Sequence, residues 1–173
     1  MTLGNGPVTI RRARTSDIEH LTRFSADMAR ETEGRVLDLA RLSQGTHALI
    51  DTDRHGFFLI AEVPLPEAPR VVGQLMVTYE WSDWRNGVFW WIQSVYVEPA
   101  WRRRGVFRAL HAAVLAQAKA DPTVCGLRLY VESDNRTAQD VYRRVGLRPS
   151  AYTVYESDFV LNRHALRDRP DEA

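Results

Sequence analysis

The chain has 173 residues, enough for one domain with a substantial core. Its 23 basic and 22 acidic residues nearly cancel, which argues against a nucleic-acid partner, because nucleic-acid-binding proteins usually carry a basic excess. The single cysteine excludes an intrachain disulfide, and no apolar run approaches the roughly 18 residues of a membrane span. Residues 1–8 lack the pattern of a secretory signal, so we expect a cytoplasmic protein with no membrane partner.

The first fifty residues predict one strand followed by two helices. Residues 8–12 favour a short strand, and an N-cap at residues 15–17 begins a helix that Gly34 is expected to end. Apolar residues across 37–50 predict a second, shorter helix, broken or loosened near Gly45.

Three strands are predicted in the middle of the chain. A continuous apolar strand begins at Gly56 and ends at a proline-rich turn. Residues 71–81 and 88–97 predict two longer strands. Asn86 and Gly87 between them indicate a hairpin, because both residues tolerate positive φ.

The rest of the chain alternates between helices and strands. We expect a helix over 106–118, a strand over 124–131, a helix over 135–145, one or two closing strands over 147–159, and a charged, loose tail from about Arg163. The order β-α-α-β-β-β-α-β-α-β predicts a mixed sheet with helices on both faces. Its ligand crevice is expected between strands 88–97 and 124–131.

An arginine-rich turn lies between the strand over 88–97 and the next helix. It contains Arg102, Arg103 and Arg104, with Gly105 at the helix start and Arg108 one turn later. A helix start presents unpaired N–H groups and partial positive charge, and a glycine lets a ligand approach that backbone. An arginine cluster alone is usually a solvated surface, but this placement favours a diphosphate site.

This turn resembles the acetyl-CoA loop of the GCN5-related N-acetyltransferase (GNAT) superfamily. The loop reads Gln/Arg-x-x-Gly-x-Gly/Ala, and Arg102-x-x-Gly105-x-Phe107 matches it except at Phe107. Phe107 either turns into the sheet, which leaves the N–H groups open, or points at the ligand. Residues 95–99, an apolar strand ending in an acidic-proline turn, are similar to the segment before the family's loop.

A second segment strengthens the resemblance. Residues 132–135, followed by Ala138, Tyr142 and Gly146-Leu147, look like the family's second cofactor segment. The two motifs and their surroundings span about residues 56–155. The resemblance implies one α/β (α+β mixed) domain over residues 1–173. It also implies a mixed, mostly antiparallel sheet of six to seven strands flanked by about four helices.

The implied activity is acetyl transfer from acetyl-CoA, the cosubstrate, to an amine on a small molecule or a protein by direct attack. Tyr142 is the implied general acid, because a phenol with a pKa of about 10 is protonated at neutral pH; otherwise it would be a core tyrosine. The residues implied to bind the cofactor are Val95, Tyr96, Val97, Arg102, Arg103, Arg104, Gly105, Val106, Phe107, Arg108 and Asn135.

The general base stays open. The candidates are Glu132, Glu80, Glu31 and Glu33, with water as a further possibility. Cys125 is expected to be a small buried hydrophobe rather than an acyl carrier, and the histidines show no metal-ligand spacing, so no metal is expected.

Four tryptophans gather around the predicted hairpin: Trp81, Trp84, Trp90 and Trp91. They favour either hairpin packing or a dimer surface, or an aromatic acceptor pocket that holds an ammonium group. Trp90 and Trp91 face opposite sides of the sheet, so at least one should lie in the core. The alternative function is a non-catalytic acyl-CoA-binding or interaction domain of the same fold, and the protein is expected to be a monomer or homodimer.

Overall fold

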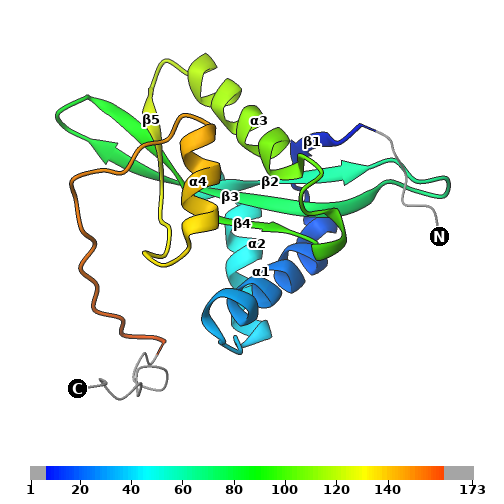
Figure 1. The fold of residues 1–173 in the computed structure, drawn as a ribbon. Helices are drawn as coiled ribbons and strands as arrows, with labels where there is room; N and C mark the ends of the chain where they lie inside the picture. The colour runs from blue at the N-terminus through cyan, green and yellow to red at the C-terminus, as the bar shows by residue number, and fades with distance from the viewer. Residues whose placement is uncertain (1–6, 162–173) are drawn as a thin grey trace.

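Apolar runs in the middle of the chain form a single mixed sheet in the computed structural model, which describes residues 7–161 (Figure 1). The strands are β1 (Thr9–Arg12), β2 (Gly56–Val63), β3 (Arg70–Ser82), β4 (Gly87–Val97) and β5 (Val124–Leu129). They follow the order β1-β2-β3-β4-β5. The first four pair antiparallel, whereas β5 is parallel to β4. The mixed sheet and the β3–β4 hairpin were both predicted.

Helices cover both faces of the sheet, as Figure 1 shows. The helices are α1 (Ile18–Glu33), α2 (Leu39–Asp51), α3 (Val106–Ala120) and α4 (Arg136–Arg144), with short 3-10 turns at Thr15–Asp17 and Pro99–Trp101. On one face, Leu21 and Phe24 of α1 and Leu49 of α2 pack on the sheet. On the other, Val106, Leu110 and Val114 of α3 belong to one buried cluster with Trp90 and other sheet residues. None of the helices in residues 7–161 has the length and apolarity that crossing a bilayer requires.

Two expectations were wrong. Within residues 7–161 the sheet has five strands rather than six or seven, because residues 147–161 form no strand. Aromatic and β-branched residues give the segment strand propensity, but a strand also needs a partner, and Tyr155 and Phe159 remain almost fully exposed. Gly45 does not break α2, which runs through it; the Asp38 cap and the buried Leu49 stabilise the helix instead. The tail expected from Arg163 lies outside the described residues.

A buried ion-pair cluster fixes the start of α1 to the sheet. Asp17 is only 4% exposed and accepts hydrogen bonds from Arg11 at 2.7 and 2.9 Å. Arg11 also donates to Glu62 on β2 at 2.6 Å. Burial alone would raise the pKa of Asp17, but the hydrogen bonds from Arg11 and from the Arg14 N–H outweigh it and hold that pKa below its ordinary value.

We therefore expect Asp17→Asn to lower the free energy of unfolding by about 2 kcal/mol at neutral pH, since it removes charge-assisted hydrogen bonds. Because the folded-state pKa is depressed, this stabilisation is present above about pH 4, the ordinary aspartate range, and is lost as the pH falls through the folded-state value. Urea unfolding at stepped pH measures it. The exposed pair Asp140–Arg143 supplies the control, Asp140→Asn, which should change stability little.

Candidate functional site

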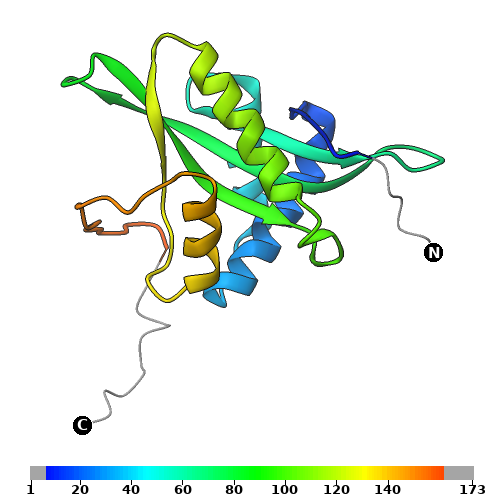
Figure 2. The same ribbon diagram turned by 45° about the horizontal axis from the view of Figure 1, so that its top comes forward.

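The parallel strands β4 and β5 separate before β4 ends. Their pairing runs from Val88 with Val124 to Ile92 with Leu129 and then stops. β4 continues to pair with β3 as far as Val97. Figure 2 shows β5 turning away from β4, with α4 beside the opening. Over residues 93–97, β4 therefore has one edge without a partner strand among the described residues.

A bulge and the strand alternation decide which backbone groups face that edge. Met76 pairs with Ser94 and Val77 with Ile92, so Gln93 is an extra residue in β4. The Glu98 N–H donates to the Val72 carbonyl at 2.9 Å. Because bonded pairs alternate in an antiparallel ladder, Tyr96 bonds towards β3, whereas the backbone groups of Val95 and Val97 face the open edge.

Two buried side chains hold the arginine-rich loop at its ends. Trp101 and Val106 are 3% and 1% exposed, whereas residues 102–105 between them are exposed. Arg103 and Gly105 have positive φ values of 62° and 82°. Glycine adopts this region without steric cost, which accounts for the glycine at position 105. The loop therefore arches out of the sheet between two fixed points.

The first turn of α3 is open to an anion. Gly105 is its N-cap and offers no side-chain cap. The first α3 bond runs from the Ala109 N–H to the Gly105 carbonyl at 3.0 Å, so the N–H groups of Val106, Phe107 and Arg108 have no partner within the helix. A Cβ built on Gly105 would meet nothing nearer than Arg108 Nη2 at 4.0 Å. Unpaired N–H groups at an uncapped helix start suit a phosphate group.

The loop arginines differ in their surroundings. Arg103 and Arg108 are exposed and form no ion pair within residues 7–161, and the Arg104 guanidinium lies 5.1 Å from the Trp101 ring centre. Arg102 instead donates from Nη2 to Glu31 at 2.5 Å and from Nε to the Val97 carbonyl at 2.9 Å. Three of the arginines thus leave their charge available at the start of α3.

Asn135 and Tyr142 are brought to the same opening by α4. Asn135 caps the helix, its Oδ1 accepting from the Ala138 N–H at 2.9 Å. Tyr142, two turns later, is half-buried, and its ring lies 5.7 Å from that of Phe107, edge to face. Burial raises the pKa of Tyr142 above its ordinary value, which keeps the phenol protonated through neutral pH.

Phe107 points neither into the sheet nor across the open N–H groups. Its ring packs between Tyr142 on α4 and His111 on α3, at 5.7 and 6.0 Å. A bulky residue at this position therefore leaves the start of α3 open and contributes to the burial of Tyr142.

Three of the four candidate general bases are already paired with an arginine side chain. Glu31 is bound by Arg102, Glu33 pairs with Arg35 at 3.2 Å, and Glu80 accepts from Arg128 at 2.7 Å and from the Trp91 indole. Glu132 is exposed at the end of the β5 connection. The structure thus offers none of Glu31, Glu33 and Glu80 as a free carboxylate.

The tryptophans divide between core and surface. Trp90 is buried against Phe57, with ring centres 5.0 Å apart, whereas Trp81 and Trp84 are exposed. Trp91 lies on the opposite face from Trp90 and stacks at 4.3 Å on Tyr130, which follows β5. An aromatic pair therefore lies where β4 and β5 separate.

Sequence reasoning missed two features of this site. Ser94, on the bulge, has a buried hydroxyl without a partner in the described residues. The polar pair Gln93-Ser94 inside an apolar strand could have indicated the bulge. The contact between Glu31 and Arg102 joins residues 71 positions apart, and no local pattern indicates it.

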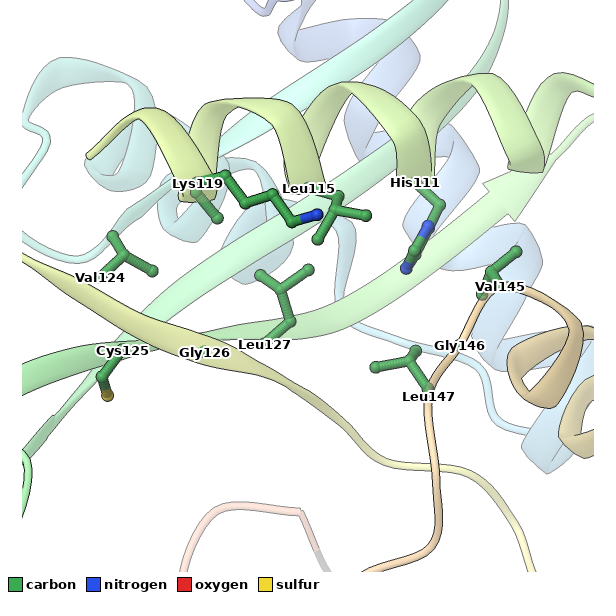
Figure 3. A pocket seen from close by; sticks show the side chains of 11 residues that line it. His111, Leu115, Lys119, Val124, Cys125, Gly126, Leu127, Val145, Gly146 and Leu147 are labelled. Carbon is green, nitrogen blue, oxygen red and sulfur yellow. The ribbon is translucent and has the colours of Figure 1, made fainter. Parts of the chain in front are cut away.

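A cavity in the described residues lies away from this opening. It measures about 450 Å³ and lies between α3, β5 and the segment after α4, with His111, Leu115, Lys119 and Leu127 in its wall (Figure 3). Half-buried Cys125 lies at its border. None of the residues implied to bind the cofactor lines it. Within residues 7–161, no group of three or more His, Cys, Asp or Glu side chains is placed to hold a metal ion.

The chain is similar to known acetyltransferases in sequence and in fold. Residues 19–147 match the acetyltransferase (GNAT) family. The solved structure of a possible acetyltransferase from Clostridium difficile 630 is 38% identical, with a TM-score of 0.80 over 89% of this chain and 99% of that one. Aminoglycoside N-acetyltransferase AAC(6')-Iy in complex with CoA shares the fold at 16% identity, with a TM-score of 0.69 over 92% of this chain and 100% of that one. No curated protein matches the sequence. The chain therefore belongs to the acetyltransferase (GNAT) family.

Proposed function

We propose that the protein is an acetyl-CoA-dependent N-acetyltransferase that moves the acetyl group to an amine by direct attack. The observation that carries the proposal is the opening between β4 and β5 beside the uncapped start of α3. One end of this opening suits a diphosphate, and its β4 edge offers free backbone groups to an extended, amide-containing arm. Coenzyme A combines these two parts.

The residues fit this cosubstrate in a defined order along the opening. The N–H groups of Val106, Phe107 and Arg108 would bind the pyrophosphate, with added charge from Arg103 and Arg104. The outward-facing N–H groups of Val97 and Val95 and the Val95 carbonyl would pair with the amides of the arm and with the thioester carbonyl, since the Val97 carbonyl already accepts from Arg102. Asn135 would hold α4 against the bound molecule.

In the reaction, the bound ammonium group first loses a proton to water. The neutral amine nitrogen then attacks the thioester carbon; the new C–N bond forms and the C–S bond breaks. The Val95 N–H stabilises the carbonyl oxygen as it gains charge. Tyr142 donates its proton to the departing thiolate and recovers one from solvent. Glu31, Glu33 and Glu80 are each paired with an arginine, which leaves exposed Glu132 or water to take the extra proton of the acetylated nitrogen.

We place the acceptor on the face of the sheet that carries Trp91 and Tyr130. Their stacked rings lie where β4 and β5 separate, and an ammonium group binds well against an aromatic face. Amines are also acceptors of a neighbour with this fold, the aminoglycoside N-acetyltransferase. The single cysteine fits the cytoplasm as the proposed location.

The occupied carboxylates favour a second candidate, a non-catalytic acyl-CoA-binding domain. Calorimetric titration with CoA, followed by release of free thiol from acetyl-CoA with a panel of small-molecule and peptide amines, separates the two. We expect heat on titration and thiol release with at least one amine. Binding without release for any amine would favour the second candidate, and no binding would contradict both.

A further inference from the structure

Glu31, near the end of α1, is held by two donors from different elements. Its Oε1 accepts from the Tyr96 hydroxyl at 3.0 Å and its Oε2 from Arg102 Nη2 at 2.5 Å. Tyr96 is 6% exposed and packs on Phe24 with ring centres 5.2 Å apart. Burial, aided by the hydrogen bond to Glu31, raises the pKa of Tyr96 to about 12, so its hydroxyl remains a donor. Glu31 is thereby fixed to the core.

Arg102 in turn joins Glu31 to the end of β4. While Nη2 contacts Glu31, its Nε donates to the Val97 carbonyl at 2.9 Å. Arg102 is the first residue of the exposed loop, and Arg103, which has a positive φ, follows it directly. Helix α1, strand β4 and the loop therefore meet at one guanidinium group, which faces the strand and the helix.

We propose that Arg102 is a positioning residue rather than a phosphate ligand, and that Glu31 acts through it to hold the loop in the shape that exposes the first N–H groups of α3. The inference rests on the proposed function, since the group positioned is the pyrophosphate site. It adds Glu31, a residue of α1, to the determinants of cofactor affinity. The two-directional donation requires arginine, because lysine lacks the rigid fork that reaches two acceptors.

The direction in which Glu31→Gln changes CoA affinity distinguishes the two possible roles of Arg102. Glu31 carries a negative charge near a site for an anion, so replacing it with glutamine removes repulsion and, by charge alone, tightens CoA binding. If Arg102 were itself a phosphate ligand, releasing it from Glu31 would tighten binding further. If Arg102 positions the loop, Glu31→Gln weakens binding in spite of the more favourable charge.

The test compares Glu31→Gln with Asp27→Asn, which removes the same charge from α1 one turn earlier, where Asp27 pairs only with Arg30 among the ion pairs of residues 7–161. Calorimetry with CoA should show Kd raised roughly threefold to tenfold by Glu31→Gln, the range of a partly exposed charged contact. Asp27→Asn should leave Kd unchanged or slightly lower. The kcat at saturating acetyl-CoA should be the same in both variants.

Two arginine variants extend the comparison. Arg102→Ala should weaken CoA binding more than Glu31→Gln, because it also loses the contact to Val97. The double variant should bind no more weakly than Arg102→Ala alone, since both changes break one network. Arg102→Lys should behave like Arg102→Ala; near-normal affinity of Arg102→Lys would mean that charge alone is needed and would overturn the proposal.

Hydrogen exchange without ligand separates this inference from the proposed function. The Trp101 and Arg102 amides bond to the Glu98 and Pro99 carbonyls at 2.8 and 3.3 Å, and we expect Glu31→Gln, but not Asp27→Asn, to speed their exchange. If the wild-type protein bound no CoA but Glu31→Gln still sped the exchange of these amides, the proposed function would be contradicted while the loop-positioning role stands. Unchanged exchange together with unchanged or tighter CoA binding would overturn the positioning role.

Discussion

Tyr142→Phe should lower kcat while leaving the affinity for CoA unchanged. The expected loss in kcat is about a hundredfold, the lower end of what a general acid contributes. The substitution removes only the hydroxyl, which makes no hydrogen bond within residues 7–161, and keeps the ring that packs on Phe107. Folding and cofactor binding should therefore survive. Steady-state kinetics with the best amine and calorimetry with CoA measure the two quantities separately.

The pH profile supplies an independent readout of the same residue. Because burial raises the pKa of Tyr142, the phenol stays protonated through neutral pH, and kcat should fall only at alkaline pH as this proton is lost. That alkaline fall should disappear in Tyr142→Phe. Tyr152→Phe, on an exposed segment, is the matched control. Full activity in Tyr142→Phe would remove Tyr142 from the mechanism and leave it as a packing residue.

Local patterns were sufficient for most of the fold. The Asn86-Gly87 hairpin, the end of α1 at Gly34 and the start of a helix at Asn135 depend on residues within one turn of each other, and each was predicted. The closing strands predicted over residues 147–159 were wrong for the opposite reason. The composition of a segment can favour a strand, but pairing into the sheet depends on a distant partner strand that the segment itself does not contain.

The candidate site shows the same division between local and distant information. Arg102 and Gly105 stand out in the sequence as one motif, yet the sequence does not show that Arg102 turns back towards Val97 and Glu31. The direction of Phe107 was equally undetermined, because it depends on α4 packing beside α3. A motif therefore predicts which backbone binds, and the tertiary contacts decide which side chains support it.

Gly105→Val should abolish measurable CoA binding, a loss of more than about a hundredfold, while the protein remains folded. At φ 82° a β-branched residue is strained by on the order of 1–3 kcal/mol. The fold survives because a Cβ there meets nothing nearer than 4.0 Å. The new methyl groups would stand in front of the open N–H groups of α3, and relaxation of φ to negative values would turn the loop away from them.

Gly34→Val distinguishes strain from loss of the binding site. Gly34 ends α1 at φ 66° with nothing within 4 Å of a built Cβ, so the substitution imposes comparable strain in equally open space. Urea unfolding should show similar destabilisation of the two variants, and calorimetry should show CoA binding retained in Gly34→Val alone. Normal CoA affinity in Gly105→Val would mean that the start of α3 is not where the pyrophosphate binds, because no phosphate reaches those N–H groups past a valine side chain.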